Sequence, residues 1–261
     1  MDFSFLSNPD AWIALLTLTF LEIVLGIDNI IFISIVTGKL PPEDRKKATR
    51  VGLFLAMFLR IGLLFGITLL TRMKKPFFSL DFGWFSADFT GQALILFAGG
   101  LFLIYKSTKE IHEKVDVKGE HESNLGKGPK KSFAGTIAQI LLIDLIFSID
   151  SILTAVGMTN GLEGALYVMI TAVVISVGIM MLFAVPVGNF VNSNPSIQIL
   201  GLAFLILIGF MLITESMHLS GAQLAGQHVG AVPKGYLYFA IAFSLAVEFL
   251  NMKMRKAKRS E

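Results

Sequence analysis

Seven long apolar segments run through this sequence, and they constrain its fold more than any other feature. They cover residues 12–36, 51–71, 91–105, 133–158, 165–191, 197–217 and 236–252. A helix needs about 20 mostly apolar residues to cross the hydrocarbon core of a bilayer. The third segment is shorter, but Lys106 and the residues after it can continue its helix into water. Because 54% of the 261 residues are hydrophobic, the pattern predicts an all-α polytopic membrane protein with seven transmembrane helices, not a soluble domain.

The Lys and Arg residues are distributed unevenly between the connections. Seventeen of the 22 lie after the first, third and seventh segments. With seven spans, these three regions share one side of the membrane, and cytoplasmic regions carry the excess of basic residues. We therefore expect a cell-membrane protein with its N-terminus outside and its C-terminus in the cytoplasm. The net charge of +3 follows from this distribution and is no argument for nucleic-acid binding.

Two matched acidic motifs interrupt the first and fourth apolar segments. One is Glu22-Ile-Val-Leu-Gly-Ile-Asp28-Asn29, and the other is Asp144-Leu-Ile-Phe-Ser-Ile-Asp150-Ser151. A charged side chain near the centre of a membrane costs about 2.5 kcal/mol or more, so acids retained there are functional candidates by default. We expect the two motifs to face each other and to form one cation site. Its predicted ligands are Glu22, Asp28, Asn29, Asp144, Asp150 and Ser151.

The offset of 122 residues between the motifs indicates an internal repeat. Gly100-Leu-Phe-Leu-Ile in the third segment also resembles Gly209-Phe-Met-Leu-Ile in the sixth, although generic apolar similarity is the alternative explanation outside the motifs. Three spans per repeat is an odd number, which predicts halves of opposite orientation, a recurrent transporter architecture with a midplane site. The predicted organisation is a first three-helix repeat over 1–105, a cytoplasmic linker over 106–132, a second, inverted three-helix repeat over 133–218, and a seventh helix with a basic cytoplasmic tail over 219–261. Within the last region, residues 220–235 are rich in small residues and are expected to form a loop.

The chemistry of the acids favours a hard divalent cation. Four carboxylates in a low-dielectric environment cannot all stay ionised without positive charge nearby. Either protons neutralise them and they only join helices by hydrogen bonds, or a metal ion does, and the matched motifs favour the metal. Carboxylate, amide and hydroxyl oxygens suit Mn²⁺, Ca²⁺ or Mg²⁺ better than Zn²⁺ or Cu⁺. The sequence has no cysteine, which excludes thiolate ligands.

The spacing within each motif predicts a local break in its helix. Residues six positions apart on a regular helix lie roughly 9 Å apart along its axis and about 120° around it. Two acids at this spacing converge on one ion only if the backbone is irregular between them. We expect Gly26 to supply the irregularity in the first motif and Ser148, by hydrogen bonding freed backbone groups, in the second.

Four further polar residues are candidates for the ion path or its gating: Arg60, Glu215, Glu248 and Asn251. Arg60 lies in the middle of the second span, where it either forms a fixed ion pair or occupies the acids when the cation leaves. Glu215 lies near the outer end of its span, where it either reaches the headgroups or acts as a gate. Glu248 and Asn251 share one helix face at positions i and i+3.

At these positions the sequence resembles the TerC family of membrane proteins, within the broader LysE transporter superfamily. The resemblance extends from about Pro9 to Met252. It rests on Phe20-Leu-Glu22-Ile-Val-Leu-Gly-Ile-Asp28-Asn29, Asp144-Leu-Ile-Phe-Ser-Ile-Asp150-Ser151, Leu59-Arg60-Ile-Gly and Phe243-Ser-Leu-Ala-Val-Glu248-Phe-Leu-Asn251. It implies a seven-span bacterial inner-membrane protein, with Mn²⁺ efflux as the activity attributed to several members. The family name comes from tellurite resistance, but a site of four acids is a poor oxyanion binder.

The leading hypothesis is an integral membrane transporter that exports Mn²⁺ from the cytoplasm through the acidic midplane site, in exchange for protons. The sequence contains no P-loop, so we do not expect ATP to drive transport within this chain, nor an organic cofactor. One alternative is an exchanger for Ca²⁺ or another divalent cation. Another is a membrane metal-delivery or assembly factor that interacts with partner proteins. An intramembrane enzyme is a third, but the matched repeat favours transport, so we do not expect enzymatic activity.

Overall fold

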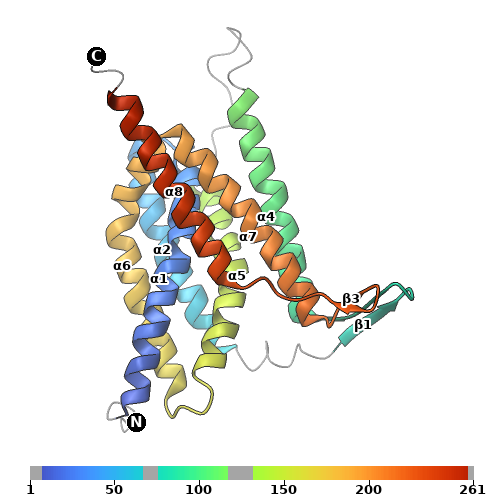
Figure 1. Ribbon diagram of the computed structural model, residues 1–261. Helices are drawn as coiled ribbons and strands as arrows, with labels where there is room; N and C mark the ends of the chain where they lie inside the picture. The colour runs from blue at the N-terminus through green and yellow to red at the C-terminus, as the bar shows by residue number, and fades with distance from the viewer. Residues whose placement is uncertain (1–7, 67–75, 117–131, 258–261) are drawn as a thin grey trace. The chain divides into compact units, whose positions relative to one another are not determined.

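The computed structural model describes residues 8–66, 76–116 and 132–257, and seven long α-helices account for most of them (Figure 1). The helices are α1 (Pro9–Thr37), α2 (Pro42–Phe65), α4 (Gly91–Asp116), α5 (Phe133–Met158), α6 (Ala165–Ser193), α7 (Pro195–Leu219) and α8 (Lys234–Ala257). All seven are long and apolar enough to cross a membrane. The prediction of an all-α protein with seven transmembrane helices is therefore confirmed. The expected extension of the third span is also present, because α4 continues to Asp116, while residues 117–131 of the predicted linker lie outside the described residues.

The helix ends follow from local sequence signals. Asn8 precedes α1, and its side-chain oxygen accepts a hydrogen bond from the backbone N–H of Asp10 at 3.0 Å. Ser132 caps α5 in the same way, since its hydroxyl oxygen accepts from the N–H of Gly135 at 3.0 Å. Such caps satisfy backbone donors that the first helical turn leaves without a partner. Proline at the first position of α1, α2 and α7 fits the same rule, because that residue needs no N–H donor.

The chain forms two compact units. The first unit contains α1, α2, α5 and α6, and the second unit contains α4, α7, α8 and a small β-sheet. Each unit combines helices from both halves of the sequence. The predicted repeats over 1–105 and 133–218 therefore contribute to both units, and their symmetry stays a prediction.

Small residues bring α1 and α6 together within the first unit. A Cβ atom added to Gly26 would lie 2.1 Å from the sulfur of Met180, so the methionine packs directly against the backbone of α1 at this glycine. A Cβ added to Gly188 of α6 would lie 2.9 Å from the hydroxyl oxygen of Ser34. Close approach at small residues is a usual way for helices to pack in membranes, where lipid removes the hydrophobic driving force between them. Apolar side chains from all four helices, including Leu18, Leu53, Ile140 and Val173, fill the remaining interior.

The second unit is built on the antiparallel pair α4 and α7. Gly100 and Gly209 face each other, and a Cβ on either one would lie within 2.8 Å of the other's carbonyl oxygen. The hydroxyl of Ser216 donates a hydrogen bond to the carbonyl oxygen of Ala93 at 2.6 Å near one end of the pair. Near the other end, the ammonium group of Lys114 donates to the side-chain oxygen of Gln198. Direct backbone contact at the two glycines therefore sets the separation of these helices.

A four-stranded antiparallel sheet completes the second unit and was not predicted. Its strands, in spatial order, are β1 (Pro76–Asp81), β2 (Phe85–Thr90), β3 (Gln223–Leu224) and β4 (Gln227–His228). Gly83, at a φ of 78°, makes the tight connection between β1 and β2, and its N–H donates to Asp81 Oδ1 at 2.9 Å. The expected loop over 220–235 thus contains two short strands, because pairing with β2 extends the sheet into this segment.

Candidate functional site

Arg60 occupies the centre of a buried ion cluster in the first unit. It projects from α2, and only 3% of its surface is exposed. Its Nη1 donates to Glu22 of α1, and its Nη2 donates to Asp144 Oδ1 of α5 at 2.6 Å. Its Nε lies 3.2 Å from both carboxylate oxygens of Asp144. The planar guanidinium group, with five donors, can join two carboxylates in this way. One cation therefore links the first acid of each motif.

Asp144 accepts further hydrogen bonds from two neutral side chains. Nδ2 of Asn29 donates to its Oδ1 at 3.3 Å, and the hydroxyl of Ser148 donates to its Oδ2 at 3.3 Å. Both neighbours are buried, as are Glu22 and Asp144 at 6% exposure each. A buried carboxylate needs such donors because it has lost its hydration. The role of Ser148 as a donor to Asp144 was missed, although its position four residues after the acid on one helix face is a direct signal for it.

The predicted helix breaks are wrong. Both α1 and α5 are continuous α-helices through Gly26–Asn29 and Ser148–Ser151. Gly26 makes room for Met180 instead of interrupting its helix, and Ser148 binds a carboxylate instead of freed backbone. The acids did not require irregular backbone, because the long side chain of Arg60 reaches Glu22 and Asp144 on separate, intact helices.

The second acid of each motif, Asp28 or Asp150, lies on the same helix as the first acid. Asp150 is half-buried on α5. The backbone of Asp28 is part of α1, but its side chain lies outside the described residues. Ser151 is buried, and its hydroxyl donates to the carbonyl oxygen of Ser148 at 3.3 Å. Among the side chains that the structure describes, no three acidic or histidine side chains form a group that could hold a metal ion. The described part of the site is thus a pair of acids held by one arginine.

A very small cavity lies next to Glu22. Its volume is about 10 Å³, and its walls are apolar apart from the carboxylate. They come from all four helices of the first unit: Leu18, Leu64, Ile152, Ala155, Met169, Ala172 and Val173. This volume is at the lower limit for one water molecule. Leu18 lies one turn N-terminal to Glu22 on α1, so apolar side chains close the cluster toward that end of the helix.

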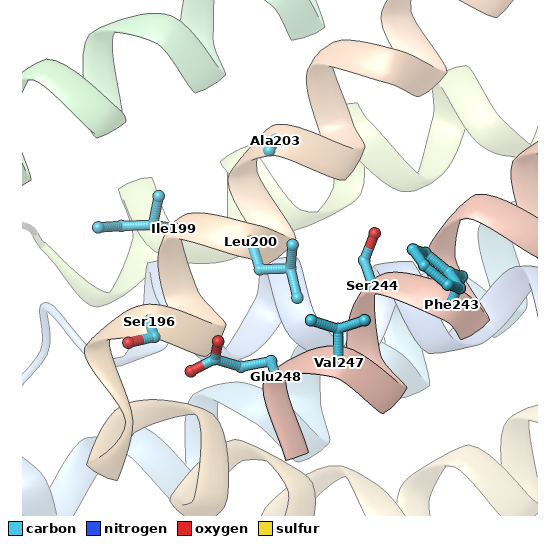
Figure 2. Close-up of a pocket in the computed structure, with 8 residues that line it drawn as sticks. All are labelled: Ser196, Ile199, Leu200, Ala203, Phe243, Ser244, Val247 and Glu248. Carbon is cyan, nitrogen blue, oxygen red and sulfur yellow. The ribbon is translucent and has the colours of Figure 1, made fainter. Parts of the chain in front are cut away.

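The remaining candidates belong to the second unit. Glu215 is half-buried on α7. Glu248 of α8 accepts from Arg255 Nη2 at 2.5 Å and from Asn251 Nδ2 at 3.5 Å, so Glu248 and Asn251 do share a helix face. Glu248 also lines a pocket of about 350 Å³ between α7 and α8. Figure 2 shows Glu248 and Ser196 at one end of this pocket and Phe243 at the other.

Comparison with known proteins gives a consistent result. The model of the family described as "Integral membrane protein TerC family" matches residues 7–261. The inner membrane protein YgdQ of Escherichia coli K12 is 48% identical over 256 residues, which cover 98% of both chains. A UPF0053 protein of Haemophilus influenzae is 44% identical over 254 residues, or 97% of this chain and 98% of the relative. The inner membrane protein YoaE of E. coli K12 is 44% identical over 253 residues, which cover 97% of this chain but 45% of that longer protein. No solved structure matches.

Seven membrane-spanning helices and near full-length similarity to inner membrane proteins together place this protein in the inner membrane as a multi-pass protein. The match to the family model covers nearly the whole chain, including both acidic motifs and Arg60. The chain belongs to the TerC family of integral membrane proteins.

Proposed function

We propose that this protein is a secondary transporter that exports Mn²⁺ from the cytoplasm through its first unit. The observation that carries the proposal is the buried cluster of Glu22, Arg60 and Asp144. Ionised groups are costly inside a membrane and are retained there chiefly for function. Three of them in contact, on three helices that span the membrane, make the first unit the best candidate for a cation path.

The charge balance of the cluster favours exchange between Arg60 and a divalent ion. Glu22 and Asp144 carry two negative charges when ionised, and Arg60 supplies one positive charge. A divalent cation in place of the guanidinium group would neutralise the pair completely and would receive carboxylate oxygens, the ligands that Mn²⁺, Ca²⁺ and Mg²⁺ prefer. Arg60 then returns when the ion leaves, so the acids are never left unpaired in a low-dielectric interior. This cycle extends the hypothesis, drawn from the sequence, that Arg60 pairs with the acids when no metal is bound.

Direction and coupling complete the proposal. The excess of Lys and Arg after the first, third and seventh spans favours an outside N-terminus and a cytoplasmic C-terminus. Protons are the proposed counter-ion, because the returning Arg60 neutralises one of the two negative charges that the metal leaves behind, and one proton would neutralise the other. The choice of Mn²⁺ over Ca²⁺ or Mg²⁺ rests on the resemblance of the acidic motifs to family members with Mn²⁺ efflux activity.

The test is flux through purified protein in liposomes. We expect Mn²⁺ to enter vesicles that contain the wild-type protein and a trapped metal-sensitive dye, with a simultaneous change of internal pH. Glu22→Gln and Asp144→Asn should abolish the flux, because each removes one charge of the pair with little change in shape. Glu43→Gln is the matched control, since Glu43 is an exposed acid in the first turn of α2 and should be dispensable.

The same experiment separates the alternatives. Ca²⁺ flux that exceeds Mn²⁺ flux would favour a Ca²⁺ exchanger. Metal binding by the purified protein without any flux would contradict transport and favour a metal-delivery or assembly factor. If the wild-type protein neither binds nor transports a divalent ion, the cation-site proposal fails as a whole.

A further inference from the structure

The small β-sheet of the second unit has two faces of opposite character. The register pairs Phe78 with Phe89 and Leu80 with Ala87, so these side chains share one face, and Phe85 and Leu224 form another pair on it. The other face carries Ser79, Asp81, Ser86, Asp88 and Gln223. On that face the hydroxyl of Ser79 donates to Asp88 Oδ1 at 2.5 Å. Successive side chains on a strand alternate between faces, which explains why one sheet is apolar on one side and polar on the other.

The apolar face is the one that is turned toward the transmembrane helices. Ala87 and Phe89 are buried there and pack with Leu94 of α4 and Met217 of α7. Figure 1 shows β1 and β3 extending sideways from the adjoining ends of α4 and α7. These are ends of helices that are long and apolar enough to cross a membrane, so the sheet adjoins one end of the transmembrane region of its unit.

Beyond the helix ends, large apolar side chains of the sheet are uncovered. The exposed fractions are 62% for Phe82 and 66% for Trp84 in the β1–β2 connection, and 51% for Leu224. The Trp84 and Phe85 rings lie 6.0 Å apart at the tip of the hairpin. A cluster of this kind signals an interaction surface. Tryptophan in particular is enriched at membrane interfaces, where its ring meets lipid and its N–H meets water.

We propose that this sheet lies flat on the surface of the bilayer that the helices cross. Its apolar face and the Phe82–Trp84 tip enter the headgroup region, while the face with Asp81 and Asp88 stays in water. Phospholipid is the occupant that fits, because the same apolar face packs on Leu94 and Met217 of two helices that are long and apolar enough to cross a membrane. No charged side chain of the described sheet then needs to leave water. The anchored sheet fixes the depth of α4 and α7 in the membrane, a role that interfacial aromatic residues fulfil in membrane proteins.

The chain offers a direct optical test, because it contains only two tryptophans, Trp12 and Trp84. In the Trp12→Phe variant, Trp84 is the sole tryptophan. This variant is reconstituted into phosphatidylcholine vesicles whose acyl chains carry bromine either near the headgroup or near the chain end. We expect emission at shorter wavelength than in denaturant, strong loss of intensity with bromine near the headgroup, weaker loss with deep bromine, and little quenching by aqueous acrylamide.

A tryptophan on the opposite face is the matched control. In the Trp12→Phe, Trp84→Phe background, Ser79→Trp places the probe on the polar face of β1. That probe should be quenched by acrylamide and not by brominated lipid. Two outcomes overturn the proposal. Trp84 quenched by acrylamide alone would show that the tip is in water. Trp84 protected from both quenchers would show that protein covers it, and dilution of the protein among more vesicles would identify a second copy if the protection is then lost.

Discussion

The two units join their helices in opposite ways. In the first unit, a charge cluster links α1, α2 and α5, since Arg60 donates to Glu22 and to Asp144. In the second unit, α4 and α7 are joined by direct backbone contact at Gly100 and Gly209. Both joints connect helices from the two halves of the sequence. In the ion cluster another cation can replace Arg60, whereas nothing can replace either backbone in the contact between Gly100 and Gly209.

In the proposed transport cycle, that difference predicts which unit changes. A carboxylate pair can exchange a guanidinium group for a metal ion or for protons, because each neutralises the same charge. Two backbones in contact have no such substitute, and any added atom forces them apart. We therefore expect the first unit to carry the cation and the second to provide a rigid support. Four predictions test this division of roles between the two units.

The largest effect is expected from the second acid of each motif. Asp28→Asn and Asp150→Asn should each abolish Mn²⁺ efflux while leaving membrane insertion intact, because an amide costs less than a carboxylate in hydrocarbon. A divalent ion that loses its water needs anionic oxygen in return. The measurement is intracellular Mn²⁺ in cells that lack other exporters, with membrane abundance checked by immunoblot and Glu43→Gln as the control. Normal efflux in both aspartate variants would restrict the site to Glu22 and Asp144.

The second effect concerns stability at Arg60. Arg60→Met removes the shared cation and leaves two buried acids without their partner, a change that typically costs about 3–5 kcal/mol. Arg60→Lys keeps the charge but cannot reproduce the planar set of donors, so it should be intermediate. Thermal unfolding of the detergent-purified proteins measures both. Adding Glu22→Gln to Arg60→Met should restore part of the loss. A fully stable Arg60→Met variant would contradict the view that Arg60 supports the two buried acids.

The third effect tests the joint of the second unit. Gly100→Ala places a methyl group where a Cβ would lie 2.5 Å from the carbonyl oxygen of Gly209. Separating α4 and α7 to accommodate it should cost about 1–3 kcal/mol. Gly178→Ala in α6 is the control, because no atom lies within 4 Å of a Cβ there. Mn²⁺ flux per folded molecule should survive Gly100→Ala. Loss of flux at normal stability would contradict a purely supporting role for the second unit.

The features that repeat along the chain could be predicted from the sequence. Seven apolar segments are visible directly, because spanning a bilayer requires a length that few other structures need. Arg60 was recognised as a partner of the acids, because an isolated mid-span charge needs one. The sheet was missed because Phe77 forms an irregularity between Pro76 and Phe78, which disrupts the alternation of apolar and polar residues in β1.

The predicted helix breaks failed for a different reason. The six-residue spacing predicts a break only on the assumption that both acids of one motif bind the same ion. The structure instead joins the first acids of two motifs through the side chain of Arg60, which is long enough to do so without any change in α1 or α5. Met180 packs against Gly26, and the sequence gives no sign of which distant side chain will approach a glycine.

The smallest effect is expected at Ser148. Its hydroxyl is one of several donors to Asp144, at 3.3 Å, and Arg60 and Asn29 remain when it is removed. Ser148→Ala should therefore lower the free energy of unfolding by only about 0.5–1.5 kcal/mol, the usual value of one hydrogen bond. The control is Thr171→Ala, which removes an exposed hydroxyl that bonds only its own helix, to the carbonyl oxygen of Tyr167 at 2.7 Å. Thermal unfolding compares the two variants with Arg60→Lys. If Ser148→Ala lowers the free energy of unfolding more than Arg60→Lys does, the Ser148 hydroxyl and not the guanidinium group is the main support of the Asp144 carboxylate. The first unit would then be held by neutral hydrogen bonds, and its contrast with the second unit would no longer rest on charge.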